Sequence, residues 1–197
     1  MTAIDVCNLA LAYLGNTQSI GSMAEQSVES VLCGRFYNLT RESLLKQYAW
    51  NFAVKTEPLV LTTETDDVYG FVYEYPGDCL RALLVGTAGA GNVVNDYAVR
   101  TVDDNGTMIK RVACDVENAR IQYVFDLQTE EDMPSEFVDA LALALASRLA
   151  MPMSSAPQIT QTVSQQAAYA LENAKRMCAM EQRQPPITSH RYTDARR

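Results

Sequence analysis

The most regular pattern in the chain is a four-residue repeat of large apolar side chains after Pro134. The repeat comprises Phe137, Leu141, Leu145 and Leu149, and alanines fill positions 140, 142, 144, 146 and 150 between and after them. This spacing is typical of a buried helix face. Proline favours the first turn of a helix, and the acidic residues Glu130, Glu131, Asp132 and Glu136 suit its positive end. The pattern predicts a helix from Pro134 that packs against neighbours on several sides.

The first 15 residues predict a shorter helix. Thr2 and Asp5 can form a capping box at its start, with an aspartate in place of the usual glutamate or glutamine, and Gly15 can end it. Its apolar face comprises Ile4, Cys7, Leu11 and Leu14.

A second, longer helix is expected over about 24–50, and its apolar side chains change side along its length. The first half carries one stripe, Val28, Leu32, Phe36 and Leu39, and the second half carries another, Leu44, Leu45, Tyr48 and Phe52. A helix that meets one core throughout keeps a single stripe. Two interpretations stay open: both sides are buried within one subunit, or one half packs against a neighbouring subunit.

The middle of the chain predicts short strands. They are expected over 69–75, 80–85, 97–102, 107–112 and 120–125, where β-branched and aromatic residues gather between turn residues. Asn105-Gly106 is a strong hairpin signal, and the glycine-rich stretch 87–92 is expected to be a mobile loop. Together they predict a small antiparallel sheet inserted between helices.

The last helix is expected over 157–180, and its apolar stripe is narrow and dominated by alanine. The stripe comprises Ile159, Val163, Ala167, Ala170, Ala174 and Met177. The fold class is therefore α+β, a bundle of about four helices formed by an N-terminal and a C-terminal pair. We expect the bundle to comprise 1–56 and 133–182, the inserted β domain 57–132, and an extended C-terminal arm 183–197.

The distribution of charge says more than the net charge of −8. Residues 57–136 hold 16 acidic and five basic side chains, whereas the arm holds four arginines and one aspartate. An acidic surface keeps a protein soluble, and it argues against gripping DNA, because phosphate binding needs a basic footprint. It suits a protein that DNA slides past. The arm, next to an acidic body, favours docking onto an acidic groove of another protein.

Five scattered cysteines without a C-x-x-C motif indicate buried free thiols in a reducing compartment. The only histidine, His190, lies in the arm, so neither a zinc site nor any other metal or cofactor is expected. The chain lacks both a basic signal peptide and an apolar run of the roughly 20 residues that span a bilayer. We expect a soluble protein made in a cytoplasm, without membrane contact.

No motif of a known catalytic constellation is present, so we expect no enzyme. Two alternatives stay open. One is a virion-associated peptidoglycan hydrolase that uses Glu130, Glu131 or Glu136 as acid and base. The other is a monomeric protein-binding module. The aromatic residues Trp50 and Phe52, with Phe137, are expected to anchor the core between helices and sheet.

The order of short motifs resembles the tail tubular protein A family, the head-to-tail adaptor of short-tailed phages. The resemblance spans most of the chain: Asn8-Leu9-Ala10-Leu11 with Leu14-Gly15, Trp50-Asn51-Phe52-Ala53, Tyr75-Pro76-Gly77-Asp78-Cys79-Leu80-Arg81, the β region, Met133-Pro134-Ser135-Glu136-Phe137 and two closing helices. Each motif is weak alone, and their order and the overall length carry the resemblance.

The resemblance implies a structural protein of the virion neck, assembled in the host cytoplasm. Such adaptors form a dodecameric ring beneath the portal, with the tail nozzle or tubular protein B below, and DNA passes through the lumen without specific binding. The helical part packs the ring, the C-terminal segment reaches the portal and the β region faces the distal tail. The residues expected to dock on the portal are Arg183, Ile187, His190, Arg191, Tyr192, Arg196 and Arg197. Those expected between subunits are Leu44, Leu45, Tyr48, Ala167, Ala170 and Ala174.

Overall fold

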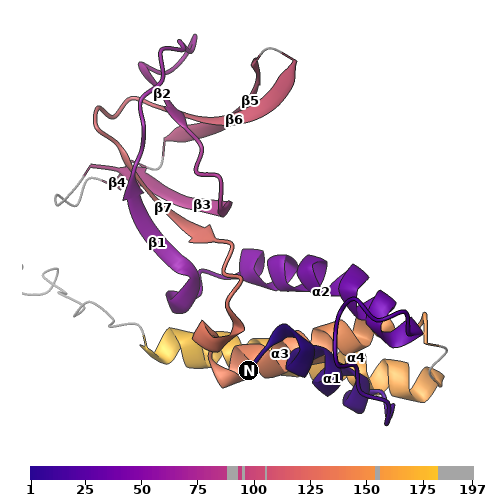
Figure 1. Cartoon of the computed structure of the whole chain (residues 1–197). Helices are drawn as coiled ribbons and strands as arrows, with labels where there is room; N and C mark the ends of the chain where they lie inside the picture. Colours follow the sequence, from indigo (N-terminus) through magenta and orange to yellow (C-terminus); the bar gives the residue numbers. More distant parts are fainter. Residues whose placement is uncertain (88–92, 95, 105, 154–155, 182–197) are drawn as a thin grey trace, which may run out of the picture.

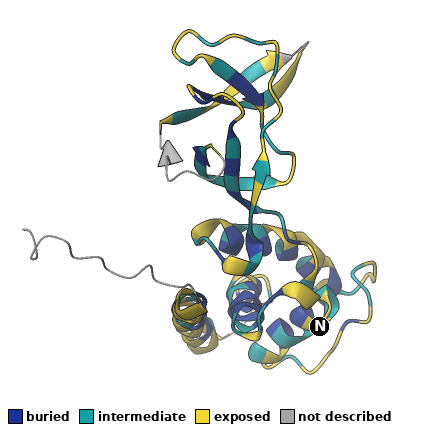
Figure 2. Ribbon diagram, turned by 90° about the vertical axis from the view of Figure 1, so that its left-hand side faces the viewer, coloured by how far each residue is buried: buried dark blue, intermediate teal, exposed yellow. Residues whose placement is uncertain are grey.

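A helical part and a β part make up the molecule, and the β part rises from one end of the helical part (Figure 1). The computed structural model describes the chain except residues 88–92, 95, 105, 154–155 and 182–197. Four α-helices and small antiparallel sheets in the middle of the chain confirm the predicted α+β class. Buried positions gather inside each part (Figure 2), so the chain has two hydrophobic cores.

Helix α1 (Ala3–Tyr13) begins and ends as expected. The Asp5 amide donates to Thr2 Oγ1 at 3.3 Å, and the Thr2 amide donates to Asp5 Oδ2 at 2.8 Å, which completes the capping box. Gly15 has a φ of +78°, a conformation that glycine adopts without strain at a helix end.

Helix α2 (Val28–Gln47) is shorter than the predicted 24–50 at both ends. The side chain of Ser27 accepts a hydrogen bond from the Ser30 amide and so caps the start. At the other end Tyr48 has an extended backbone, and the indole of Trp50 donates to the Leu44 carbonyl at 3.0 Å. This bond folds the chain back over the last turn, and a short 3-10 turn (Asn51–Ala53) follows.

Helix α3 (Ser135–Leu149) lies at the centre of the helical part and packs against α1, α2 and α4 (Pro157–Glu181). Its predicted repeat is buried along its whole length. Pro134 is the N-cap residue rather than a first-turn residue, and a 3-10 turn (Glu130–Asp132) precedes it. Helix α4 packs mainly against α3 and forms an outer flank, seen nearly end-on in Figure 2.

The β part contains two antiparallel sheets, whereas the sequence predicted one. Strands β1 (Val54–Pro58), β7 (Arg120–Phe125), β3 (Cys79–Gly86) and β4 (Val93–Val94) form the first, and β2 (Phe71–Glu74), β6 (Thr107–Cys114) and β5 (Tyr97–Asp104) form the second. Apolar side chains of both sheets share one core, among them Tyr73, Val112, Ile121 and Tyr123. Two facing sheets bury these side chains between them, which a single layer would leave uncovered.

Strand β1 was not predicted, and it begins three residues before the expected domain boundary at 57. Its sequence, Val-Lys-Thr-Glu-Pro, carries one large apolar side chain and therefore no strand signal. It forms because every residue of the strand pairs with β7. The predicted loop 87–92 and the turn residue Asn105 lie largely outside the described residues, and Gly106 beside it has a φ of +87°.

The aromatic anchor is confirmed where the helical part meets β1. The ring of Phe137 lies 4.9 Å from that of Trp50 and 5.0 Å from that of Phe52, both edge to face. Trp50 and Phe137 are each 1% exposed, and Phe52 is half-buried. The three rings join the end of α2, the chain leading into β1 and the start of α3.

Candidate assembly surfaces and the junction pocket

Helix α2 presents an aliphatic stripe to solvent. Val28, Val31 and Leu39 are 65%, 47% and 55% exposed, and Leu32 and Phe36 between them are half-buried. The opposite side of the same helix is buried against the core through Cys33, Tyr37, Leu44 and Leu45. The change of side that the sequence predicted is therefore present, and the stripe in the first half of the helix is the outward one.

The prediction of which residues lie between subunits needs correction. Leu44, Leu45 and Ala174 are at most 5% exposed, so these three side chains are already covered within one chain. The prediction was wrong for them because an apolar stripe shows that a face is buried without showing which neighbour buries it. Tyr48 and Ala167 are half-buried, and Ala170 is 8% exposed and lines the groove described next. Contact of these three residues with a neighbour stays a prediction. Val31, which the sequence reasoning missed, lies three residues after Val28 on the same outward face.

A groove of about 450 Å³ lies between α1 and α4, with α3 as its floor. Its lining includes Leu143 and Asp139 of α3 and Tyr169 of α4, whose side chain is 73% exposed. Tyr13 of α1 donates its hydroxyl proton to Asp139. Burial and this carboxylate raise the pKa of Tyr13 to about 12, so the hydroxyl stays protonated. The groove was not predicted, because its residues come from three separate helices.

A smaller depression of about 220 Å³ lies between α2 and α4, on the other side of α4. Ala167 lines it, together with Ala144 and Arg148 of α3. No acidic side chain is among the described residues that line this depression.

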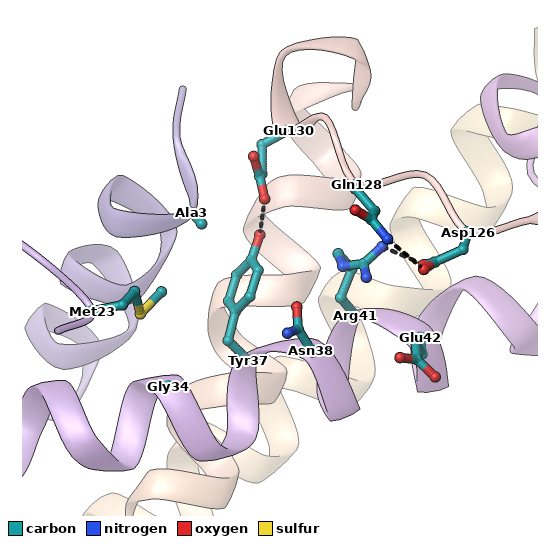
Figure 3. A pocket seen from close by; sticks show the side chains of 10 residues that line it. All are labelled: Ala3, Met23, Gly34, Tyr37, Asn38, Arg41, Glu42, Asp126, Gln128 and Glu130. Atoms are coloured by element: carbon teal, nitrogen blue, oxygen red, sulfur yellow. Dashed lines mark hydrogen bonds and ion pairs between the residues drawn. The ribbon is translucent and has the colours of Figure 1, made fainter. Parts of the chain in front are cut away.

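A polar pocket of about 400 Å³ lies where α2 meets the segment that leads from β7 to α3 (Figure 3). Arg41 donates from Nη1 to Asp126 Oδ1 at 2.6 Å and to the Leu127 carbonyl. Tyr37 donates its hydroxyl proton to Glu130 Oε1 at 2.7 Å. Burial, followed by the Glu130 carboxylate, raises the pKa of Tyr37. These contacts hold the junction segment against α2.

The three glutamates of the hydrolase alternative lie in or near this junction. Glu130 accepts the hydrogen bond from Tyr37, Glu131 is exposed, and Glu136 is half-buried and accepts a hydrogen bond from Ser135. The use of these residues as acid and base stays untested. The residues predicted to dock on the portal, from Arg183 to Arg197, lie outside the described residues.

Cys7, Cys33, Cys114 and Cys178 are buried free thiols, as predicted, and Cys79 is half-buried. Among the residues that the structure describes, no group of three or more histidine, cysteine, aspartate or glutamate side chains could hold a metal ion. Over the same residues, no helix combines the length and the hydrophobicity needed to cross a membrane.

No protein-family model matches this chain, and a comparison with curated proteins finds none that matches.

Proposed function

We propose that this protein is a structural head-to-tail adaptor of a short-tailed bacteriophage. Copies of the chain form a ring between the portal and the tail nozzle or tubular protein B, extend the DNA channel and provide the platform for the tail. The order of motifs along the chain supports this proposal. An architecture of four helices with a β part in the middle of the chain agrees with it.

The observation that carries the proposal is the outward aliphatic stripe of α2, formed by Val28, Val31 and Leu39. Burying an aliphatic side chain fully is worth about 1.5–3 kcal/mol, and these three are already partly covered, so one such contact is modest. A modest contact suffices in a ring, because each subunit is held by two neighbours and by the portal at the same time. The stripe therefore suits a chain that assembles on a template.

The charge of the β part supports a channel that does not hold DNA. Three of its six basic residues form ion pairs: Lys55 with Glu57 and Asp78, Arg100 with Asp66, and Arg111 with Glu64. The remaining carboxylates outnumber the remaining basic groups, so the net charge of this region repels phosphates. In this proposal the β part faces the distal tail, the basic arm docks on the portal, and the adaptor acts passively in the virion neck.

Sedimentation velocity and negative-stain electron microscopy test the proposal on the full chain, alone and with the portal protein of the same phage. We expect a ring on the portal. A variant with Val28, Val31 and Leu39 changed to serine should keep its thermal unfolding temperature and lose the ring. A matched variant changes Val60 and Val68 to serine. These exposed valines lie in the segment between β1 and β2, so the variant should assemble normally. A chain that stays monomeric and does not sediment with the portal would rule the proposal out.

A further inference from the structure

We infer that the groove between α1 and α4 receives the α2 stripe of the next copy in the ring. This inference rests on the proposed function and goes beyond it by naming both halves of the contact between subunits. The occupant is a second copy of this chain, and three observations lead to it: the lengths of the two surfaces, their charges and the directions in which they face.

The lengths match. The stripe runs from Val28 to Leu39, which is roughly 16 Å at the rise of an α-helix. The wall that α4 gives to the groove runs from Gln165 to Asn173, which is roughly 12 Å. The groove therefore accommodates about two of the three turns of the stripe, and its exposed Tyr169 offers a large apolar surface to the valines of the stripe.

The charges are complementary. Arg35 lies on the outward side of α2, is exposed, and makes no hydrogen bond or ion pair with the described residues. In the groove Asp139 is half-exposed, accepts a hydrogen bond from Tyr13 and has no cationic partner among the described residues. No basic side chain is among the groove residues that the structure describes. A neighbour's Arg35 therefore finds an unneutralised carboxylate in this groove.

The charge also selects between the two hollows beside α4. The depression between α2 and α4 is lined by Arg148 and by no described carboxylate, so it would repel Arg35. It is also about half the volume of the groove between α1 and α4. The stripe of a neighbour therefore fits the groove that contains Asp139.

The two surfaces face different directions on one subunit. On α3, Asp139 and Leu143 line the groove, whereas Ala144 and Arg148 line the depression next to α2. Because an α-helix turns by about 100° per residue, these two pairs lie on different sides of α3. The stripe points away from the core, on the side of α2 opposite its buried residues. A contact between two unlike surfaces is heterologous, and repetition of such a contact closes into a ring when the rotation allows it.

Cysteine cross-linking of the full chain on the portal tests the contact. One preparation carries Val31→Cys, another carries Tyr169→Cys, and the two are mixed, assembled and oxidised mildly. We expect a disulfide-linked dimer in the mixture and little in either preparation alone. The unaltered chain controls for its own cysteines, and Val68→Cys is a matched exposed position away from both surfaces. A ring that forms without the 31–169 link, or with 31–31 links, overturns the inference and leaves the proposed function standing. If no ring forms on the portal, the proposed function fails first.

Charge reversal gives a second test. Arg35→Glu should reduce ring formation about tenfold or more, and adding Asp139→Lys in the same chain should restore it. Arg35→Glu/Glu131→Lys adds a positive charge at an exposed position outside the stripe and the groove, so it controls for net charge and should not restore the ring. Failure of Asp139→Lys to restore a ring in a double variant that is folded would contradict the pairing of Arg35 with Asp139.

Discussion

Arg41 of α2 and Asp126, which follows β7, are separated by 85 residues and form an ion pair with 2.6 Å between Nη1 and Oδ1. Their side chains are 4% and 20% exposed. The same guanidinium binds the Leu127 carbonyl, and Tyr37 binds Glu130 one turn away. One face of α2 thus holds the segment through which the β part joins α3. This contact fixes how the two parts of the molecule are attached.

Replacement of Arg41 by methionine should destabilise the protein by about 2 kcal/mol. This loss is smaller than the loss expected on breaking a fully buried ion pair, because Asp126 keeps some contact with water. The loss arises because Asp126 and the Leu127 carbonyl lose their donor while they remain covered. Urea unfolding, followed by circular dichroism, measures the change in the free energy of unfolding.

The double variant Arg41→Met/Asp126→Leu serves as the control for this pair. It removes both charges, so we expect it to recover at least half of the stability that the single variant loses. Equal losses in the single and double variants would show that the aliphatic stem of Arg41, rather than its charge, supports the junction.

The same pair predicts a dependence of stability on pH. Burial alone would raise the pKa of Asp126, but hydrogen bonds from Arg41 and Gln128 hold it below its usual value of 3.8. A carboxyl group whose pKa is lower in the folded state stabilises the protein above the unfolded pKa, and this contribution is lost as the pH falls through the folded pKa. The difference in unfolding free energy between the unaltered chain and Asp126→Asn should therefore be largest at neutral pH and shrink towards about pH 2.5. A constant difference across this range would contradict the assignment.

The helices could be predicted because their signals are local. The repeat from Phe137 to Leu149 and the capping box of Thr2 and Asp5 each lie within one helix. The end of α2 could not be predicted, because it depends on the bond between the Trp50 indole and the Leu44 carbonyl. Strand β1 likewise depends on pairing with β7, more than 60 residues away in the chain.

The candidate surfaces could be predicted only in part. The change of side along α2 was visible in the sequence, but the sequence does not tell which stripe the rest of the chain covers. The structure covers Leu44 and Leu45 and leaves Val28 and Leu39 outward. The groove around Asp139 and the pocket around Arg41 each combine residues from segments far apart in the chain, so no local pattern marked them.

The aromatic anchor predicts a spectroscopic signature. Trp50 is the only tryptophan, and it is 1% exposed, so its emission should be blue-shifted in the folded protein and shift to the red on unfolding. Phe137→Ala leaves a cavity beside the Trp50 ring and should lower the free energy of unfolding by about 3–5 kcal/mol. Phe52→Ala is the comparison. Because Phe52 is only half-buried, this variant should lose less stability than Phe137→Ala. Urea unfolding followed by Trp50 fluorescence measures both, and equal costs would contradict the difference in burial.

The second sheet contains two arginines directly opposite each other, Arg100 of β5 and Arg111 of β6. Like charges opposite each other destabilise a strand pair, and here Asp66 and Glu64 from the segment before β2 offset the repulsion, at 3.0 and 2.8 Å. The double variant Glu64→Gln/Asp66→Asn should therefore speed amide hydrogen exchange in β5 and β6 and leave α3 unchanged. Adding Arg100→Thr removes one of the two like charges and should slow exchange again. If exchange stays fast in the triple variant, the carboxylates act by holding the segment before β2 in place, and the repulsion between the arginines contributes little.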